Sequence, residues 1–91
     1  MVTEFDVRQQ MNEIDRSAMH PLRKARRFLM LTRNVRSAVR QFQNGVDILA
    51  RDCMEDEANR LQSSSERLVD LAREVKDKAR LTLARARESR S

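Results

Sequence analysis

The stretch RRFLMLTRNVRSAVRQFQNG, residues 26–45, decides the fold because it carries an apolar stripe and a basic one together. Apolar residues recur every three or four positions and continue beyond its end: Phe28, Leu31, Val35, Val39, Phe42, Val46, Leu49 and Cys53. This spacing is typical of one face of an α-helix. Asn44-Gly45 resembles a hairpin turn, but the stripe keeps its phase through it. We therefore expect one continuous helix over about residues 22–53, with the glycine costing about 1 kcal/mol relative to alanine.

A shorter helix is predicted before this stretch. Thr3 can cap it, with Asp6 three residues later as the second member of a capping pair. One narrow apolar stripe follows: Val7, Met11, Ile14 and Ala18. The helix should end before His20-Pro21, because the residue before a proline avoids the α conformation and proline favours the first turn of a new helix. These signals place it at about residues 4–18.

A third helix is predicted after the central one. Its apolar stripe has a heptad-like register: Ala58, Leu61, Ser65, Leu68, Ala72, Val75, Ala79, Thr82 and Ala86. The stripe predicts a helix over about residues 58–87, and the polar tail, residues 88–91, should fray.

The break between the second and third helices contains neither glycine nor proline, so two positions stay open. Four acidic residues lie between 52 and 57, and they favour a helix N-terminus near residues 55–58. Ser63 followed by Glu66 forms a second candidate start, a capping box within the third segment. We prefer the turn at 52–57.

The composition places the chain in the all-α class. Its 91 residues make one domain at most and include a single Gly and a single Pro. There are three Phe and no Trp or Tyr, so the core must be thin. A thin core on long helices usually needs a partner chain. We predict a helical hairpin that assembles into a homodimeric bundle, or a hetero-assembly.

The single cysteine and the absence of long apolar runs bear on location. Cys53 cannot form an intramolecular disulfide, which fits a reducing, cytoplasmic compartment, and its place in the stripe predicts a buried thiol. No apolar run approaches 18 residues, so we expect no membrane span. The first ten residues are acidic and lack an apolar core, which is unlike a signal or transit peptide.

Charge is distributed unevenly along the chain, whose net charge is +5. Residues 20–51 carry eight basic residues against Asp47, and residues 67–91 carry a net charge of +4. Residues 1–19 and 52–66 are net acidic, at −2 and −4. The basic charge is therefore concentrated in the central helix and again near the C-terminus.

Arginines form a file along the central helix. Arg26, Arg33 and Arg40 are seven residues apart, on the side opposite the apolar stripe, and Arg36 flanks them. Seven residues of helix rise about 10.5 Å, so the guanidinium groups should follow one straight line. Few acids interrupt the file, and this favours binding of a polyanion over a merely solvated face.

The residue types favour double-stranded RNA as the polyanion, although they do not distinguish RNA from DNA. Proteins that bind single strands stack bases on aromatic side chains, and this chain has no Trp or Tyr. Zinc-finger, RRM and KH signatures are absent from the sequence, and a helix-turn-helix needs shorter helices. A long basic helical face suits sequence-independent recognition of duplex RNA by its shape.

The run FLML, residues 28–31, holds more apolar residues than one stripe can use. Part of it should face a second surface, which we interpret as a dimer or helix-hairpin interface. Insertion into an acidic membrane surface as a basic amphipathic helix is the alternative.

Catalytic chemistry is not predicted. His20 is the only histidine, so no Ser/His/Asp or Cys/His set can be assembled. The acids at 52–57 lack the pattern of a calcium loop, and we interpret them as helix capping. We expect neither an enzyme nor a site for a metal, a cofactor or a small-molecule substrate.

The segment RNVRSAVRQFQNGV, residues 33–46, resembles the start of the long second helix of insect nodavirus B2 proteins. The likeness rests on eight positions: Asn34, Val35, Arg36, Val39, Gln41, Phe42, Gln43 and Val46. B2 proteins are helical suppressors of RNA silencing whose dimer, a four-helix bundle, lies along double-stranded RNA and shields it from Dicer. The resemblance implies that Arg33, Arg36 and Arg40 contact phosphates and 2′-hydroxyls, and that the apolar stripe makes the dimer.

A second function class stays open. The segment SERLVDLAREVKDKAR, residues 65–80, resembles the last helix of MIT-type three-helix adaptor domains. The alternative to RNA binding is therefore a helical adaptor or chaperone subunit that packs against a partner protein.

Overall fold

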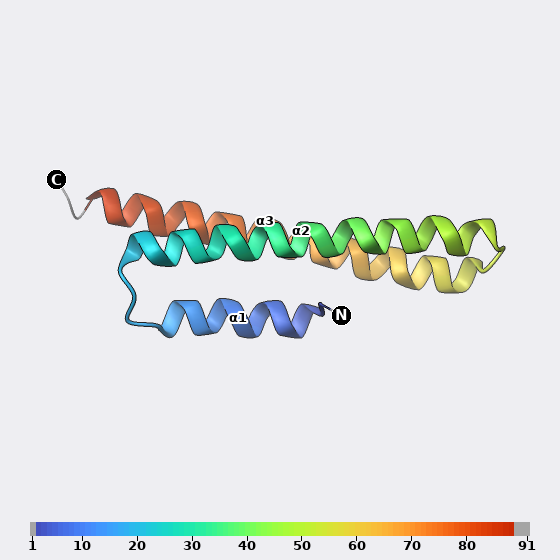
Figure 1. Ribbon diagram of the computed structural model, residues 1–91, viewed down its shortest axis with the longest axis horizontal. Coiled ribbons are helices and arrows are strands. Elements are labelled where there is room, and N and C mark those ends of the chain that lie inside the picture. Colours follow the sequence, from blue (N-terminus) through green and yellow to red (C-terminus); the bar gives the residue numbers. More distant parts are fainter. Residues whose placement is uncertain (1, 89–91) are drawn as a thin grey trace.

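Three helices make up the computed structural model, which describes residues 2–88. They are α1 (Glu4–Arg16), α2 (Pro21–Arg51) and α3 (Glu55–Glu88). No strand occurs in the described part of the chain, so the all-α class and the long central helix are confirmed. α2 and α3 form an antiparallel hairpin, and α1 lies along the half of it that is remote from the turn (Figure 1). The result is a rod of 58 × 19 × 14 Å.

The start of α1 follows the predicted cap, but its end does not. The Thr3 hydroxyl accepts a hydrogen bond from the Asp6 amide (3.2 Å), and the Asp6 carboxylate accepts one from the Thr3 amide (3.3 Å). α1 then ends at Arg16 rather than at 18, because Ser17 adopts an extended conformation and its hydroxyl donates to the Ile14 carbonyl (2.8 Å). Ala18 is consequently exposed and is no part of the apolar stripe.

The junction between α1 and α2 is built as the sequence predicts. Pro21 is the first residue of α2, one position before the predicted start, and His20 precedes it as the cap. The His20 Nδ1 accepts a hydrogen bond from the Leu22 amide (3.2 Å) and satisfies one of the free donors at this helix end.

α2 ends two residues earlier than predicted, in a Schellman motif. The Cys53 amide donates to the Ala50 carbonyl (3.2 Å) and the Met54 amide to the Leu49 carbonyl (2.9 Å). Cys53 takes the left-handed conformation of this motif, with φ 61°. It lies in the turn rather than in the helix, so the prediction of a buried thiol is wrong: Cys53 is exposed.

α3 begins at Glu55, three residues before the predicted start, and continues to Glu88. Its first turn holds three acids, whose negative charges interact favourably with the positive end of the helix dipole. The turn is therefore shorter than the predicted 52–57, and the alternative start at Ser63 is wrong because that residue lies well inside the helix. Of the predicted frayed tail, Glu88 is helical and residues 89–91 lie outside the described residues.

The core lies between all three helices. Phe28 and Val35 of α2 and Leu71 and Val75 of α3 are almost completely buried, and α1 contributes Val7 to the same cluster. The predicted stripe of α3 is likewise directed inward, from Ala58 to Ala86.

Close packing at Gly45 sets how α2 and α3 fit together. Gly45 lies inside α2, which confirms that Asn44-Gly45 is not a turn. A Cβ at this position would lie 2.8 Å from Leu61 Cδ2. Nearby, the Gln43 amide group donates to the hydroxyl of fully buried Ser65 (2.9 Å). These two contacts fix the register of the hairpin.

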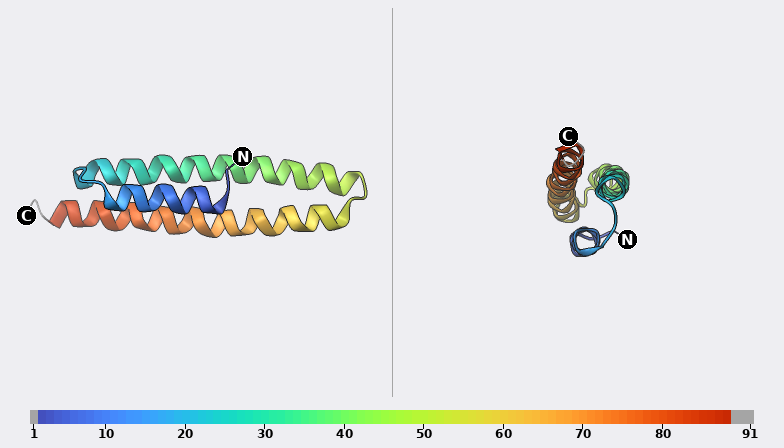
Figure 2. Two further views of the ribbon diagram at one scale, coloured as in Figure 1. Left: turned by 90° about the horizontal axis from the view of Figure 1, so that it is seen from below. Right: turned by 90° about the vertical axis from the view of Figure 1, so that its left-hand side faces the viewer.

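Burial changes along the apolar stripe of α2. Phe28, Leu31 and Val35 are buried, whereas the next four members are only partly buried: Val39, Phe42, Val46 and Leu49. The change occurs where α1 begins, since Val2 and Thr3 lie beside Phe42. Beyond that point the described residues form only the two helices of the hairpin (Figure 2).

Replacing Cys53 by glycine should stabilise the protein. A side chain in the left-handed conformation costs about 1–2 kcal/mol, of which the greater chain entropy of glycine cancels part. We expect Cys53→Gly to raise the free energy of unfolding by about 0.5–1 kcal/mol in urea denaturation followed by circular dichroism. Cys53→Ala, which keeps a Cβ, is the control and should unfold like the wild type. If the glycine variant were no more stable than the alanine variant, the left-handed conformation of Cys53 would not be strained.

Substitutions at Gly45 should separate the effect of helix packing on stability from the effect of helix propensity. Alanine gains about 1 kcal/mol in propensity, which should offset the rotation of the Leu61 tip that it forces, so Gly45→Ala should be nearly neutral. Gly45→Val inserts two further carbons into the same gap and should destabilise by about 1–3 kcal/mol. The same denaturation measurement applies, and equal stability of the two variants would show that the close approach is unimportant.

Candidate nucleic-acid interface

The four predicted arginines of α2 lie exposed on the surface of the rod. Arg26, Arg33 and Arg40 follow one line along the helix, and Arg36 lies beside them. Among residues 2–88, no carboxylate lies within ion-pair distance of any of the four. Their charges are therefore available to an external anion.

The arginines at 33, 36 and 40 point away from α1. Arg27 and Asn34 mark the side of α2 that faces α1, because they line a hollow together with Gln10 and Ile14. Arg36 is nine residues from Arg27, which is about two and a half helical turns, so it lies on the opposite side of α2. Arg33 and Arg40 are three and four residues from Arg36 and share that side.

α3 carries cations on the corresponding side. Glu74 and Lys78 face α1, since they pair with Arg8 and Asp15 of that helix. Lys76 is two residues from each of them, about 200° around the helix, and therefore faces away from α1. Arg73 and Arg80 lie three and four residues from Lys76 and extend the same side.

The register of the hairpin brings the two sets of cations together. Gln43 lies level with Ser65, and along antiparallel helices this places Arg33 and Arg36 level with about residues 71–75 of α3. We call the combined surface the basic face. It consists of seven exposed or partly exposed cations on two helices: Arg26, Arg33, Arg36, Arg40, Arg73, Lys76 and Arg80.

Most acids lie outside the basic face. Four exposed acids border it, Asp47 of α2 and Glu66, Asp70 and Asp77 of α3, and none of the four forms an ion pair with a described residue. The largest acidic groups are in α1, on the other side of the hairpin, and in the first turn of α3, at its tip. Cations therefore outnumber acids on the basic face, by seven to four, which would orient this side of the rod toward a polyanion.

The aromatic side chains are absent from the basic face. Phe28 is fully buried and Phe42 is half-buried against the core. Phe5 is 73% exposed, but it lies on α1, away from the basic face. Leu29, 47% exposed, is the large apolar side chain between the arginines. Within residues 2–88 the basic face therefore lacks the stacking platforms that single-strand binding requires.

The sequence-based prediction missed the three cations of α3. Its only signal for them was the net charge of +4 over residues 67–91. The pattern of one helix does not reveal which neighbour it packs against or at what level, so the sequence could not join Lys76 to Arg33 and Arg36.

The predicted dimer seam divides into two parts in the structure. Phe28, Leu31 and Val35 are buried within the chain by α1 and α3, so they are not available to a second chain. The remaining seam residues, Val39, Phe42, Val46 and Leu49, are only partly covered. Of the FLML run, Phe28 and Leu31 are in the core, whereas Leu29 and Met30 are exposed.

Two other kinds of site can be assessed for residues 2–88. No group of three His, Cys, Asp or Glu side chains is close enough to hold a metal ion in this range. None of the three helices described is long and apolar enough to cross a membrane.

Comparison with known proteins found no relative: no family model, no curated protein and no solved structure matches this chain.

Proposed function

We propose that this protein binds double-stranded RNA, independently of sequence, through the basic face. The observation that carries the proposal is the alignment of seven cations from two antiparallel helices on one side, none of them in an ion pair with a described residue. Each phosphate that such a surface neutralises releases counterions, which favours binding at low salt.

The dimensions and chemistry of the face favour a duplex. The rod is 58 Å long, which suits a target of the length that double-stranded-RNA-binding domains contact, about 16 base pairs. Six of the seven cations are arginines, whose guanidinium groups donate several hydrogen bonds to phosphates and 2′-hydroxyls. The wide, shallow minor groove of RNA presents those groups to a smooth helical surface.

The resemblance of residues 33–46 to nodavirus B2 proteins supports a biological role as well. A protein that covers duplex RNA hinders the enzymes that cut it, and we propose suppression of RNA silencing in the cytoplasm as the role. In this proposal the protein is a binding protein and not an enzyme.

An adaptor or chaperone subunit that packs against a partner protein is the second candidate. The observation that favours it is the half-covered apolar groove near the hairpin turn, where Phe42 and Leu49 are only partly buried. This candidate requires no polyanion, so an RNA-binding measurement tests the first candidate, and the groove needs a test of its own.

RNA binding should depend on the arginines of the basic face. We expect an RNA duplex of about 20–25 base pairs to bind tightly in fluorescence anisotropy, with an affinity that falls steeply as salt rises. Arg33→Ala/Arg36→Ala/Arg40→Ala should lower the slope of log K against log salt by about 3, one for each lost phosphate contact. The single strand of the same sequence should bind more weakly, because the face offers no stacking platform.

The matched control removes the same charge from other surfaces. Arg16→Ala/Arg60→Ala/Arg67→Ala changes three exposed arginines outside the basic face and should keep most of the affinity. Circular dichroism verifies that both variants stay helical. Absence of binding at low salt, or equal losses in the two triple variants, would refute the proposed function.

We also propose that the chain forms a homodimer, as its thin core suggests. Met30 and Phe5, 57% and 73% exposed, are large apolar side chains outside the basic face that are left for a second copy. Sedimentation equilibrium over a range of concentrations should give twice the mass of one chain. A constant mass of one chain would contradict the dimer without affecting the basic face.

A further inference from the structure

The groove between α2 and α3 is occupied along only part of its length. α1 fills the part remote from the turn, with Val7 and Met11 buried in it. From the level of Phe42 to the turn at residues 52–54, no third helix formed by residues 2–88 covers the hairpin (Figures 1 and 2). We call this part the distal groove. It is lined by partly buried apolar side chains that include Phe42, Leu49 and Leu61.

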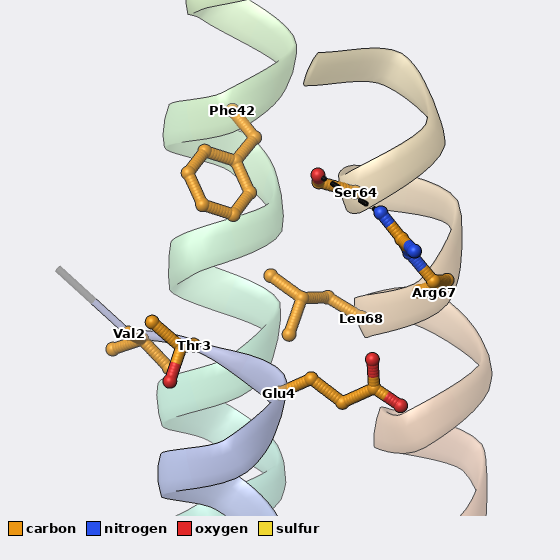
Figure 3. Close-up of a pocket in the computed structure, with 7 residues that line it drawn as sticks. All are labelled: Val2, Thr3, Glu4, Phe42, Ser64, Arg67 and Leu68. Atoms are coloured by element: carbon orange, nitrogen blue, oxygen red, sulfur yellow. Dashed lines mark hydrogen bonds between the residues drawn. The ribbon is translucent and has the colours of Figure 1, made fainter. Parts of the chain in front are cut away.

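The distal groove opens at the N-terminal end of α1. There Val2, Phe42 and Leu68 surround a hollow of about 300 Å³. Figure 3 shows Phe42 of α2 and Leu68 of α3 on either side of the space beyond Thr3, with Arg67 at its rim. Arg67 donates to the Ser64 hydroxyl (3.4 Å), and no carboxylate among the described residues pairs with it.

α1 itself shows what this groove accepts. It is an amphipathic helix with apolar residues at positions 7, 11 and 14, and it runs in the same direction as α3. Its polar edge pairs with α3: Arg8 lies 3.6 Å from the Glu74 carboxylate, and Asp15 pairs with Lys78. The hairpin thus binds α1 through apolar contacts in the groove and through ion pairs along the edge of α3.

The same edge of α3 continues along the distal groove with opposite charge. Arg60 and Arg67 precede Glu74 at intervals of seven residues, so all three lie in one line on the side that faces α1. Glu74 has its partner in Arg8, whereas Arg60 and Arg67 have no acidic partner among the described residues. A helix seated in the distal groove would therefore need acids where α1 has Arg8.

The α2 edge shows an equivalent continuation. Asn34 and Gln41 line hollows together with α1 residues, and Ile48 follows Gln41 after seven residues. Ile48 is 57% exposed, although a large apolar side chain would normally be covered. Its exposure is explained if a further helix contacts it.

From these observations we infer that the distal groove is a docking site for a short amphipathic helix of a partner protein, with acidic residues two turns apart along the edge that faces Arg60 and Arg67. The uncovered part of α2, from Phe42 to Arg51, is about 15 Å long at 1.5 Å per residue, which fits about ten residues of helix. A second copy fits less well, because a symmetric contact across this groove would oppose the same arginines of both chains.

This site is independent of the basic face. Arg60 and Arg67 lie on the α1 side of the hairpin, whereas Lys76 and Arg36 lie on the other side. A partner helix and an RNA duplex can therefore bind at the same time, and either can be lost without the other.

A pair of peptides based on α1 tests the site. The probe is TEFDVRQQMNEIDR, residues 3–16, with Arg8→Glu, and the control is the unaltered sequence. The new glutamate should pair with Arg60 when the peptide binds in the distal groove. In the part of the groove that α1 occupies, the same glutamate would face Glu74 and be repelled by it. Fluorescence anisotropy should show the probe binding about tenfold or more tightly than the control, with a gain of helix in circular dichroism.

Charge reversal in the full chain makes the test specific. Arg60→Glu/Arg67→Glu should weaken binding of the probe about tenfold or more and strengthen binding of the control peptide. Arg73→Glu/Arg80→Glu, the matched change on the basic face, should leave both affinities unchanged. Equal binding of the two peptides, no binding of the probe, or binding that survives Arg60→Glu/Arg67→Glu would overturn the inference. A dimer abolished by Ile48→Asp, with neither peptide bound, would assign the groove to a second copy instead.

Discussion

The rest of the structure depends on the close, registered packing of α2 against α3. Gly45 lets the helices approach until its missing Cβ would touch Leu61, and the Gln43–Ser65 hydrogen bond joins two polar groups at the same level. Ser65 is fully buried, so a shift of register would leave its hydroxyl without this partner, at a cost of about 1–3 kcal/mol. A single polar pair in an apolar seam can specify register in this way. The register in turn decides which cations of α3 lie beside the arginines of α2.

The second constraint is the difference in length between α1 and the hairpin. α1 has 13 residues, against 31 in α2 and 34 in α3, so it can cover only part of the groove. Where it lies, it completes a three-helix core and places its acids on the side opposite the basic face. Where it ends, the same apolar seam is left half-buried. One short helix thus leaves the basic face on one side of the hairpin and an uncovered apolar groove on the other.

Much of the fold could be predicted because its signals are local. The Thr3 cap, the Pro21 start and the phase of apolar residues through Gly45 all depend on neighbours within about one helical turn. The errors occurred where local pattern does not decide the outcome. Cys53 keeps the phase of the stripe, but the helix has ended before it. The end is set by backbone hydrogen bonds of the turn, and the left-handed position holds a cysteine instead of the glycine that would have predicted this end. Likewise the stripe looks uniform from Phe28 to Leu49, although only α1 determines which half is buried.

For the candidate site, exposure of the arginines followed from helical spacing alone, whereas the contribution of α3 required the three-dimensional pairing.

The central claim is that two helices form one RNA-binding surface. NMR chemical-shift perturbation of backbone and guanidinium signals on addition of an RNA duplex tests it most directly. We predict shifts at Arg33 and Arg36 of α2 together with Arg73, Lys76 and Arg80 of α3, and none along α1 or at Arg60. Shifts confined to α2, or centred on α1 and the distal groove, would contradict it.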